Sequence, residues 1–135
     1  MPRSSRIMSN TGIYHTLLRG INQQRIFEEE SDYQYFLAKL VQIKKEIGIL
    51  LFGYCIMSNH VHLLLKESET RVEYLFRRLG PSYAYYFNNK YARSGHLFQD
   101  RYKSEPVQDG RHLAAAIIYS SESGSCGDLR RRRRL

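Results

Sequence analysis

The pattern of apolar positions predicts strands and helices in alternation, starting with a strand over Gly12 to Leu18. The turn-prone residues 19–22 end this strand, and an acidic segment follows in which Ser31 is a candidate helix cap. Beyond Ser31, apolar side chains recur at helical spacing until Gly48, which is typical of a helix that ends at a glycine. The first third of the chain therefore predicts one strand followed by one amphipathic helix.

A buried hairpin is the next prediction. Residues 49–56 form a nearly continuous apolar run, which is typical of a strand covered on both faces. Ser58 and Asn59 then favour a tight turn, and His60 to Leu65 reads as a second strand. We expect these two strands to pair antiparallel.

The rest of the chain predicts a long helix, a strand and a final helix. The helix covers residues 71–91, although Gly80-Pro81 is expected to break or kink it. A loop over residues 92–98 leads to a strand over residues 101–107, and Asp109 is a candidate cap for a helix over about residues 111–122. The predicted fold class is therefore α+β, a ferredoxin-like antiparallel sheet of β-α-β-β-α-β order with an extra C-terminal helix.

Length and charge indicate one domain followed by a basic tail. The 135 residues fit a single domain, which we assign to residues 1–123. The net charge is +8, but five of the positive charges are Arg130 to Arg134, which leaves +3 for the rest. Residues 124–135 have few apolar side chains and are expected to be disordered, as in a natural tail or a truncated or frameshifted gene.

The chain shows no apolar stretch long enough to cross a bilayer. Residues 1–10 are polar and basic, without the apolar core of a secretory signal. We therefore expect a cytoplasmic protein with no membrane partner.

Basic and aromatic side chains gather between Arg71 and Lys103. This stretch has seven cations, Arg77 and Arg78 among them, against two carboxylates, and it also has nine aromatic rings. Cations neutralise phosphates and aromatic faces stack on unpaired bases, so the stretch favours a nucleic-acid partner. For most of the rings, an amphipathic helix that buries them in the core is the favoured interpretation, and the nucleic-acid interpretation rests on the charges.

The most specific local feature is the sequence His60-Val61-His62 on a predicted strand. Side chains alternate along a strand, so both imidazoles lie on one face with Cα atoms ~6.6 Å apart. Two imidazoles so placed can bind one metal ion. The alternative is a pair of half-exposed histidines with no ligand.

Three blocks of the sequence resemble the REP-associated tyrosine transposases and related single-tyrosine insertion-sequence transposases of the HUH type. The blocks are Tyr14 to Gly20 (YHTLLRG), Tyr54 to Leu64 (YCIMSNHVHLL) and Tyr91 to Ser104 (YARSGHLFQDRYKS). Their order and spacing match as well, and the resemblance covers roughly Gly12 to Tyr119. It implies a ferredoxin-like domain that cleaves single-stranded DNA, with a hairpin at the element end, through a covalent 5′-phosphotyrosine.

The resemblance also implies a divalent cation at His60 and His62 and a tyrosine nucleophile on the helix after the last strand. Tyr119 falls at that position, and Tyr102 is the runner-up. A phenol, with a pKa of ~10, ionises more readily than a serine hydroxyl and is a feasible nucleophile. A cation there would polarise a phosphate oxygen and stabilise charge on the departing 3′ oxygen.

The sequence departs from the family after Tyr119. In the family a polar residue four positions on can complete the metal site, and here that position is Ser123, a poor ligand. Glu122, one residue earlier, offers a hard carboxylate suited to Mg²⁺ or Mn²⁺. Arg93, Arg101 and Lys103 follow the family's basic loop and are predicted to contact phosphate.

Two other functions stay open at this stage. The altered C-terminus would also fit a catalytically impaired DNA-binding relic of such a transposase. A metallohydrolase of another kind is less favoured, because such enzymes need further ligands and the five histidines here are scattered. Related enzymes can act as dimers, so a homodimer that exchanges its terminal helix is a further expectation.

Overall fold

A ferredoxin-like order of elements is what the computed structural model of the chain shows. It describes residues 9, 11–68, 70–107 and 126–128. The elements are β1 (Ile13–Arg19), η1 (Ile21–Gln23), α1 (Glu30–Ile47), β2 (Leu50–Ile56), β3 (His60–Lys66), α2 (Val72–Lys90), β4 (Lys103–Val107) and β5 (Cys126–Asp128). The predicted β-α-β-β-α-β order is thereby confirmed.

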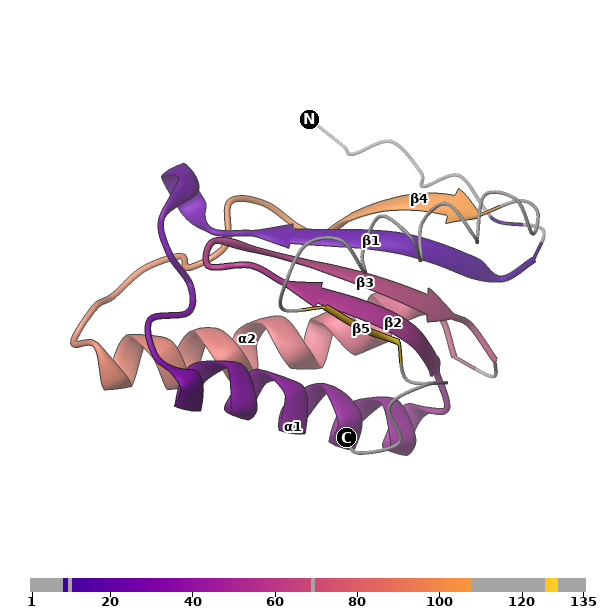
Figure 1. The fold of residues 1–135 in the computed structure, drawn as a ribbon, viewed down its shortest axis with the longest axis horizontal. Coiled ribbons are helices and arrows are strands. Elements are labelled where there is room, and N and C mark those ends of the chain that lie inside the picture. The colour runs from indigo at the N-terminus through magenta and orange to yellow at the C-terminus, as the bar shows by residue number, and fades with distance from the viewer. Residues whose placement is uncertain (1–8, 10, 69, 108–125, 129–135) are drawn as a thin grey trace.

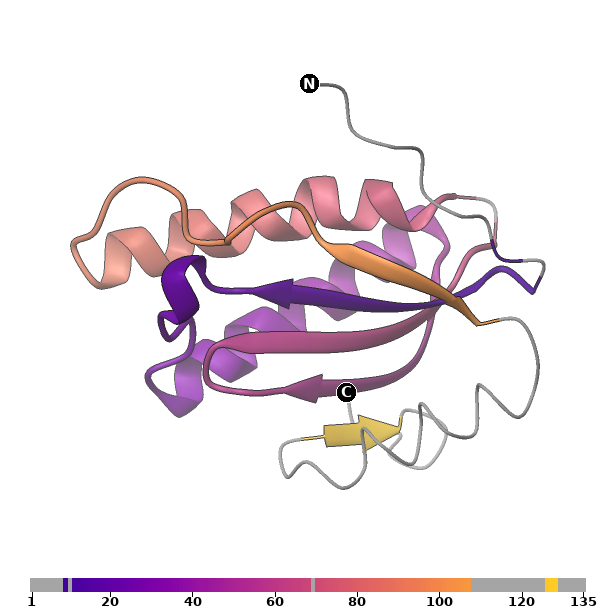
Figure 2. The same ribbon diagram turned by 90° about the horizontal axis from the view of Figure 1, so that it is seen from above.

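The strands form one antiparallel sheet in the order β4-β1-β3-β2-β5. Both helices pack on the same side of this sheet, as Figures 1 and 2 show. We call that side the helix-covered face and the opposite side the distal face. The main core lies between the sheet and the helices, with Val61, Leu63 and Leu65 of β3 buried in it. Their alternation places His60 and His62 on the distal face.

The C-terminal region lies largely outside the described residues. The predicted helix over residues 111–122 falls there, and so do Tyr119 and Glu122. Within the tail that was expected to be disordered, Cys126–Asp128 pairs with β2 as strand β5. Neither helix of the described part is long and apolar enough to span a membrane.

Helix α2 continues through Gly80-Pro81, so a break at this pair, one of the two predicted outcomes, is wrong. Pro81 has no N–H to give the carbonyl of Arg77, and a proline in a helix interior costs about 3 kcal/mol. Leu79 and Tyr83, on either side of the pair, are both fully buried. Burying side chains of that size contributes about 1.5–3 kcal/mol each, enough to hold the two halves in line.

The start of α1 is set by Asp32 rather than by Ser31. Glu29 is the N-cap residue, and Ser31 lies inside the helix. The carboxylate Oδ2 of Asp32 accepts hydrogen bonds from the N–H groups of Glu28 and Glu29, at 2.9 and 3.0 Å. A carboxylate in this position satisfies amides that have no partner within the helix, and it complements the helix dipole.

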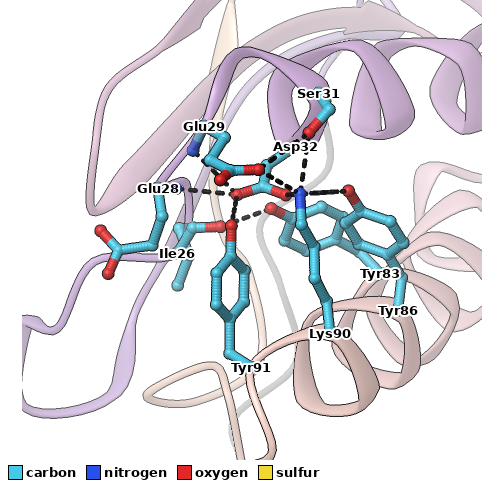
Figure 3. A network of polar contacts seen from close by, with 9 residues as sticks. All are labelled: Ile26, Glu28, Glu29, Ser31, Asp32, Tyr83, Tyr86, Lys90 and Tyr91. Carbon is cyan, nitrogen blue, oxygen red and sulfur yellow. Dashed lines mark hydrogen bonds and ion pairs between the residues drawn. The ribbon is translucent and has the colours of Figure 1, made fainter.

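The same carboxylate fastens α1 to the C-terminal end of α2 (Figure 3). Tyr86 donates to Oδ1 at 2.8 Å, Tyr91 donates to Oδ2 at 2.6 Å, and Lys90 lies 2.8 Å from Oδ1. Asp32 is fully buried, and burial alone would raise its pKa. The hydrogen bonds from Lys90, Tyr91, the Glu28 amide and Tyr86 outweigh burial and hold the pKa of Asp32 well below its usual value.

The segment before α1 connects this network to the hairpin turn. Tyr83 donates a hydrogen bond to the carbonyl of Ile26. The N–H groups of Ile26 and Phe27 both donate to the carbonyl of Ser58, at 2.8 and 3.2 Å. The turn before β3 is therefore hydrogen-bonded to the segment that α2 contacts through Tyr83.

Candidate functional site

The two histidines of β3 lie side by side on the distal face. The His60 and His62 ring centroids are 5.1 Å apart and the rings are nearly perpendicular, at 86°. In the register of β1 against β3, Arg19 faces His60 and Leu17 faces His62. The described residues that surround the pair form a cavity of about 290 Å³, lined by Leu17, Arg19, Gly20, Gln23, Asn59, His60 and His62.

The ring of His60 is oriented by its neighbour in the turn. His60 Nδ1 lies 2.7 Å from Asn59 Oδ1, and because an amide oxygen only accepts, Nδ1 is the donor. The neutral ring then carries its lone pair on Nε2, the nitrogen that a metal would take. Asn59 is itself held, since its Nδ2 donates to the carbonyl of Gln23 at 3.3 Å.

His62 has a histidine partner on β1. The Nε2 of His15 lies 3.0 Å from Nδ1 of His62, and the rings stack with centroids 5.0 Å apart. This contact engages Nδ1 of His62, as Asn59 engages Nδ1 of His60. Partners of this kind fix the tautomer and the orientation of metal-binding histidines.

Both histidines have a lowered pKa, which favours the neutral form of each ring. Burial, and then the positive charge of Arg19, lowers the pKa of His60. Burial also lowers the pKa of His62 to about 4, with smaller contributions from His15, His60 and Arg19. A neutral imidazole is the form that binds a metal.

The two histidines are a donor pair that one divalent cation could share. Two neutral imidazoles lie on one face, each oriented through its Nδ1 atom. Among the described residues, no group of three or more His, Cys, Asp or Glu side chains could hold a metal ion. Two protein ligands from the described part leave coordination positions for further ligands such as a phosphate oxygen.

The basic residues predicted to contact DNA fall into two groups. Lys103 pairs with Leu17, which pairs with His62, so Lys103 lies on the distal face two strands from His62. Arg101 is exposed just before β4. Of these two cations, Lys103 is the one that the strand register places on the same face as the histidines.

The other predicted cations have partners within the helix layer and its loops. Arg78 lies 2.6 Å from Glu46 of α1, and Arg77 lies 3.6 Å from Glu73 and over the ring of Tyr74. Arg93 donates to Asn88, to Gln24 and to the carbonyl of His96. The structure therefore does not bring these three residues together with the histidines.

Ten of the eleven tyrosines are in the described residues, and all ten lie away from the distal face. Tyr14, Tyr54 and Tyr102 are buried on the helix-covered face. Tyr102, the runner-up nucleophile, stacks on Phe76 of α2 with centroids 4.1 Å apart. The remaining seven belong to α1, to α2 or to its C-cap, namely Tyr33, Tyr35, Tyr74, Tyr83, Tyr85, Tyr86 and Tyr91.

Sequence reasoning left Arg19 and Asn59 out of the site and gave His15 no partner. The available signal was strand alternation, because His15, Leu17 and Arg19 are spaced two apart and must share a face. Which face they share depends on the pairing of β1 with β3, and the sequence does not state that register. The position of Asn59 beside His60 in a tight turn carried no comparable signal.

A ferredoxin-like sheet with two histidines on one central strand is the architecture that this site defines. Residues 9–119 match the family described as "Transposase IS200 like", so the chain belongs to this family. The resemblance noted in the sequence is thereby confirmed.

Two solved structures share the fold. The structure of a REP-associated tyrosine transposase bound to a REP hairpin aligns with a TM-score of 0.69 and 11% identity, over 89% of this chain and 70% of that chain. A structure described as a transposase from Deinococcus radiodurans aligns with a TM-score of 0.60 and 19% identity, over 90% of this chain and 96% of that chain. No curated protein sequence matches this chain.

Proposed function

We propose that this transposase cleaves and rejoins single-stranded DNA through a covalent 5′-phosphotyrosine, with Tyr119 as the nucleophile. The observation that carries the proposal is the pair of neutral, oriented imidazoles of His60 and His62 on the distal face. A divalent cation, Mg²⁺ or Mn²⁺, held there would polarise a phosphate oxygen and stabilise charge on the departing 3′ oxygen. Glu122 is the proposed third protein ligand.

The residues around the histidines have roles that fit this proposed reaction. Arg19 and Lys103 bind backbone phosphates near the scissile one, since both lie on the distal face, on the β1 and β4 side of the histidines. Asn59 and His15 keep the imidazoles in place. The Tyr119 phenol loses its proton as its oxygen forms a bond to phosphorus, the bond from phosphorus to the 3′ oxygen breaks, and the 3′ oxygen takes up a proton to become a hydroxyl.

The choice of Tyr119 is supported by the positions of the other tyrosines. All ten described tyrosines lie on the helices, on the C-cap of α2 or on the helix-covered face. Attack on a phosphate held at His60 and His62 requires a phenol on the distal face. The eleventh tyrosine, Tyr119, lies outside the described residues and is not excluded in this way.

Replacing Tyr119 with phenylalanine should abolish the covalent protein–DNA adduct while leaving DNA and metal binding unchanged. Only the attacking oxygen is lost. The measurement is incubation with labelled single-stranded DNA and Mn²⁺, followed by a denaturing gel. The matched control is Tyr102→Phe, which removes the same atom on the helix-covered face and should keep the adduct. An adduct in the first variant and none in the second would reverse the assignment.

DNA binding should favour single strands over duplex and should weaken steeply with salt. Arg101→Gln and Lys103→Gln should each lower the salt slope for a single strand by about 0.7, the value for one phosphate contact. Arg78→Gln is the matched control, because Arg78 is paired with Glu46 in the helix layer. The measurement is fluorescence anisotropy over a salt series. An equal change in all three variants would refute the proposed path of the DNA.

A binding-only relic is the second candidate function. It is favoured by Ser123, a poor ligand at the position where the family can have a metal-binding residue. The neighbour structure that holds a REP hairpin supports a hairpin partner for either candidate. Wild-type protein that binds single-stranded DNA but forms no adduct with any such substrate would establish the relic in place of the enzyme.

A further inference from the structure

A second and larger cavity lies between α2 and the segment that leads into β4. It has a volume of about 730 Å³, within the range of ligand-binding sites. One wall is a stripe of α2, in which Phe76, Gly80 and Ala84 follow one another at four-residue spacing. The opposite wall is formed by residues 95–102.

Gly80 has no structural reason to be a glycine. Its φ is not positive, and a Cβ built on it would meet nothing within 4 Å. Glycine weakens a helix interior relative to residues with a side chain. A side chain at this position would instead project into the cavity, since Gly80 is on its wall. Glycine at this position therefore leaves the cavity larger, although it makes the helix less stable.

The wall of the cavity combines aromatic surface with polar groups. Phe76 and Tyr102 stack on each other within the lining, and Phe98 also contributes to it. Pro81 also lines this wall, next to Gly80. Arg101, an exposed cation, stands at the rim. A flat ring with polar edges and an attached phosphate matches this combination.

The cavity adjoins the histidine site through the end of β1. Leu18 and Ile21 line the large cavity, and the two residues between them, Arg19 and Gly20, line the cavity of the histidines. The loop is tied to the same point, because Ile21 N–H donates to the carbonyl of Leu97 and Gln99 N–H donates to the carbonyl of Arg19, both at 2.9 Å. A strand that leaves the histidines over the end of β1 reaches the cavity directly.

We propose that this cavity binds one unpaired base of the single-stranded DNA that crosses the distal face. The inference rests on the proposed function, because it takes the DNA at the histidines as its starting point. The base enters next to the stacked pair of Phe76 and Tyr102, and Arg101 contacts the phosphate attached to it. The cavity thus fixes which phosphate arrives at His60 and His62.

The test combines a cavity-filling variant with DNA that lacks single bases. Gly80→Leu fills the cavity and should not lower the melting temperature, because leucine is a better helix former than glycine. Gly80→Gln is a second filler with a polar end. The control is Asn89→Leu, which adds the same side chain at an exposed position of α2 outside the cavity. The probes are a labelled single-stranded oligonucleotide and a set in which one nucleotide at a time is abasic.

One abasic position should weaken binding to wild-type protein about tenfold, as expected for the loss of one base contact. Gly80→Leu and Gly80→Gln should weaken binding of the intact strand by a similar factor and should be insensitive to that abasic position. Asn89→Leu should behave like wild type. This non-additivity is the signature of a direct contact between the base and the cavity.

The opposite outcomes separate the inference from the proposed function. If both Gly80 variants bind every oligonucleotide as wild type does, the cavity is not a base site, while single-strand binding stands. If Gly80→Leu changes the oligomeric state and leaves DNA affinity unchanged, the cavity receives a second copy and the inference is wrong. If the abasic coupling is present but no adduct forms in the Tyr119 experiment, the base site stands and the cleavage proposal fails.

Discussion

Replacing Asp32 with alanine is expected to lower the free energy of unfolding by about 3–5 kcal/mol, the usual cost of breaking a buried ion pair. The buried carboxylate accepts hydrogen bonds from the amides of Glu28 and Glu29, just before α1, and contacts Tyr86, Lys90 and Tyr91 at the end of α2. Its removal leaves Lys90 without its buried partner and these two amides without their acceptor. The measurement is urea denaturation followed by circular dichroism.

A matched control is Glu30→Ala, which removes an exposed acidic residue from the same first turn. The loss in free energy of unfolding should not exceed the ~0.3–1 kcal/mol of a surface charge near a helix dipole.

The pH dependence of stability supplies a second check through the variant Asp32→Asn. Because the folded pKa of Asp32 is depressed, its contribution is present in full above the unfolded pKa and is lost as pH falls through the folded pKa. The stability gap between wild type and Asp32→Asn should therefore be constant near neutral pH and shrink only in strong acid. A gap that closes near neutral pH would contradict this account.

Replacing both His60 and His62 with alanine is expected to reduce metal-dependent adduct formation by about a thousandfold or more. The fold should persist, because the core side of β3 is carried by Val61, Leu63 and Leu65. Calorimetry with Mn²⁺ should show loss of metal binding, and circular dichroism should be unchanged. Lys66→Ala is the control on β3, at the far end of the strand from the turn. Adduct formation that survives the double substitution would show that the metal is bound elsewhere.

The fold was predictable where the evidence was local and periodic. The alternation around His60-Val61-His62 and the helical repeat after Ser31 gave elements that agree with the structure to within a few residues at each end. Prediction failed where distant residues overrule local preference. Serine is a common cap, yet the capping box at the start of α1 uses Asp32, whose burial is compensated by Lys90, 58 residues away. The Gly80-Pro81 pair favours a break, yet burial of Leu79 and Tyr83 against the rest of the core keeps α2 continuous.

The site was predictable in part for the same reason. A His-x-His spacing guarantees a shared face on a strand, and β3 has that geometry. The partners of the two rings come from the turn and from β1, so they required the register of the sheet. Charge alone did not separate Lys103, which lies on the distal face, from Arg78, which pairs with Glu46. The partner of a surface cation depends on which element packs beside it.

The charge of Arg19 affects how metal and DNA binding depend on each other at the proposed site. Of the described residues that line the histidine cavity, Arg19 is the charged one, and its field already opposes protonation of His60 and His62. The same repulsion opposes a bare metal cation. A DNA phosphate beside Arg19 offsets that charge, so by thermodynamic linkage metal and DNA raise each other's affinity by the same factor. On the proposed function, we therefore expect the protein to bind its metal weakly on its own and to cleave only once the DNA strand is bound.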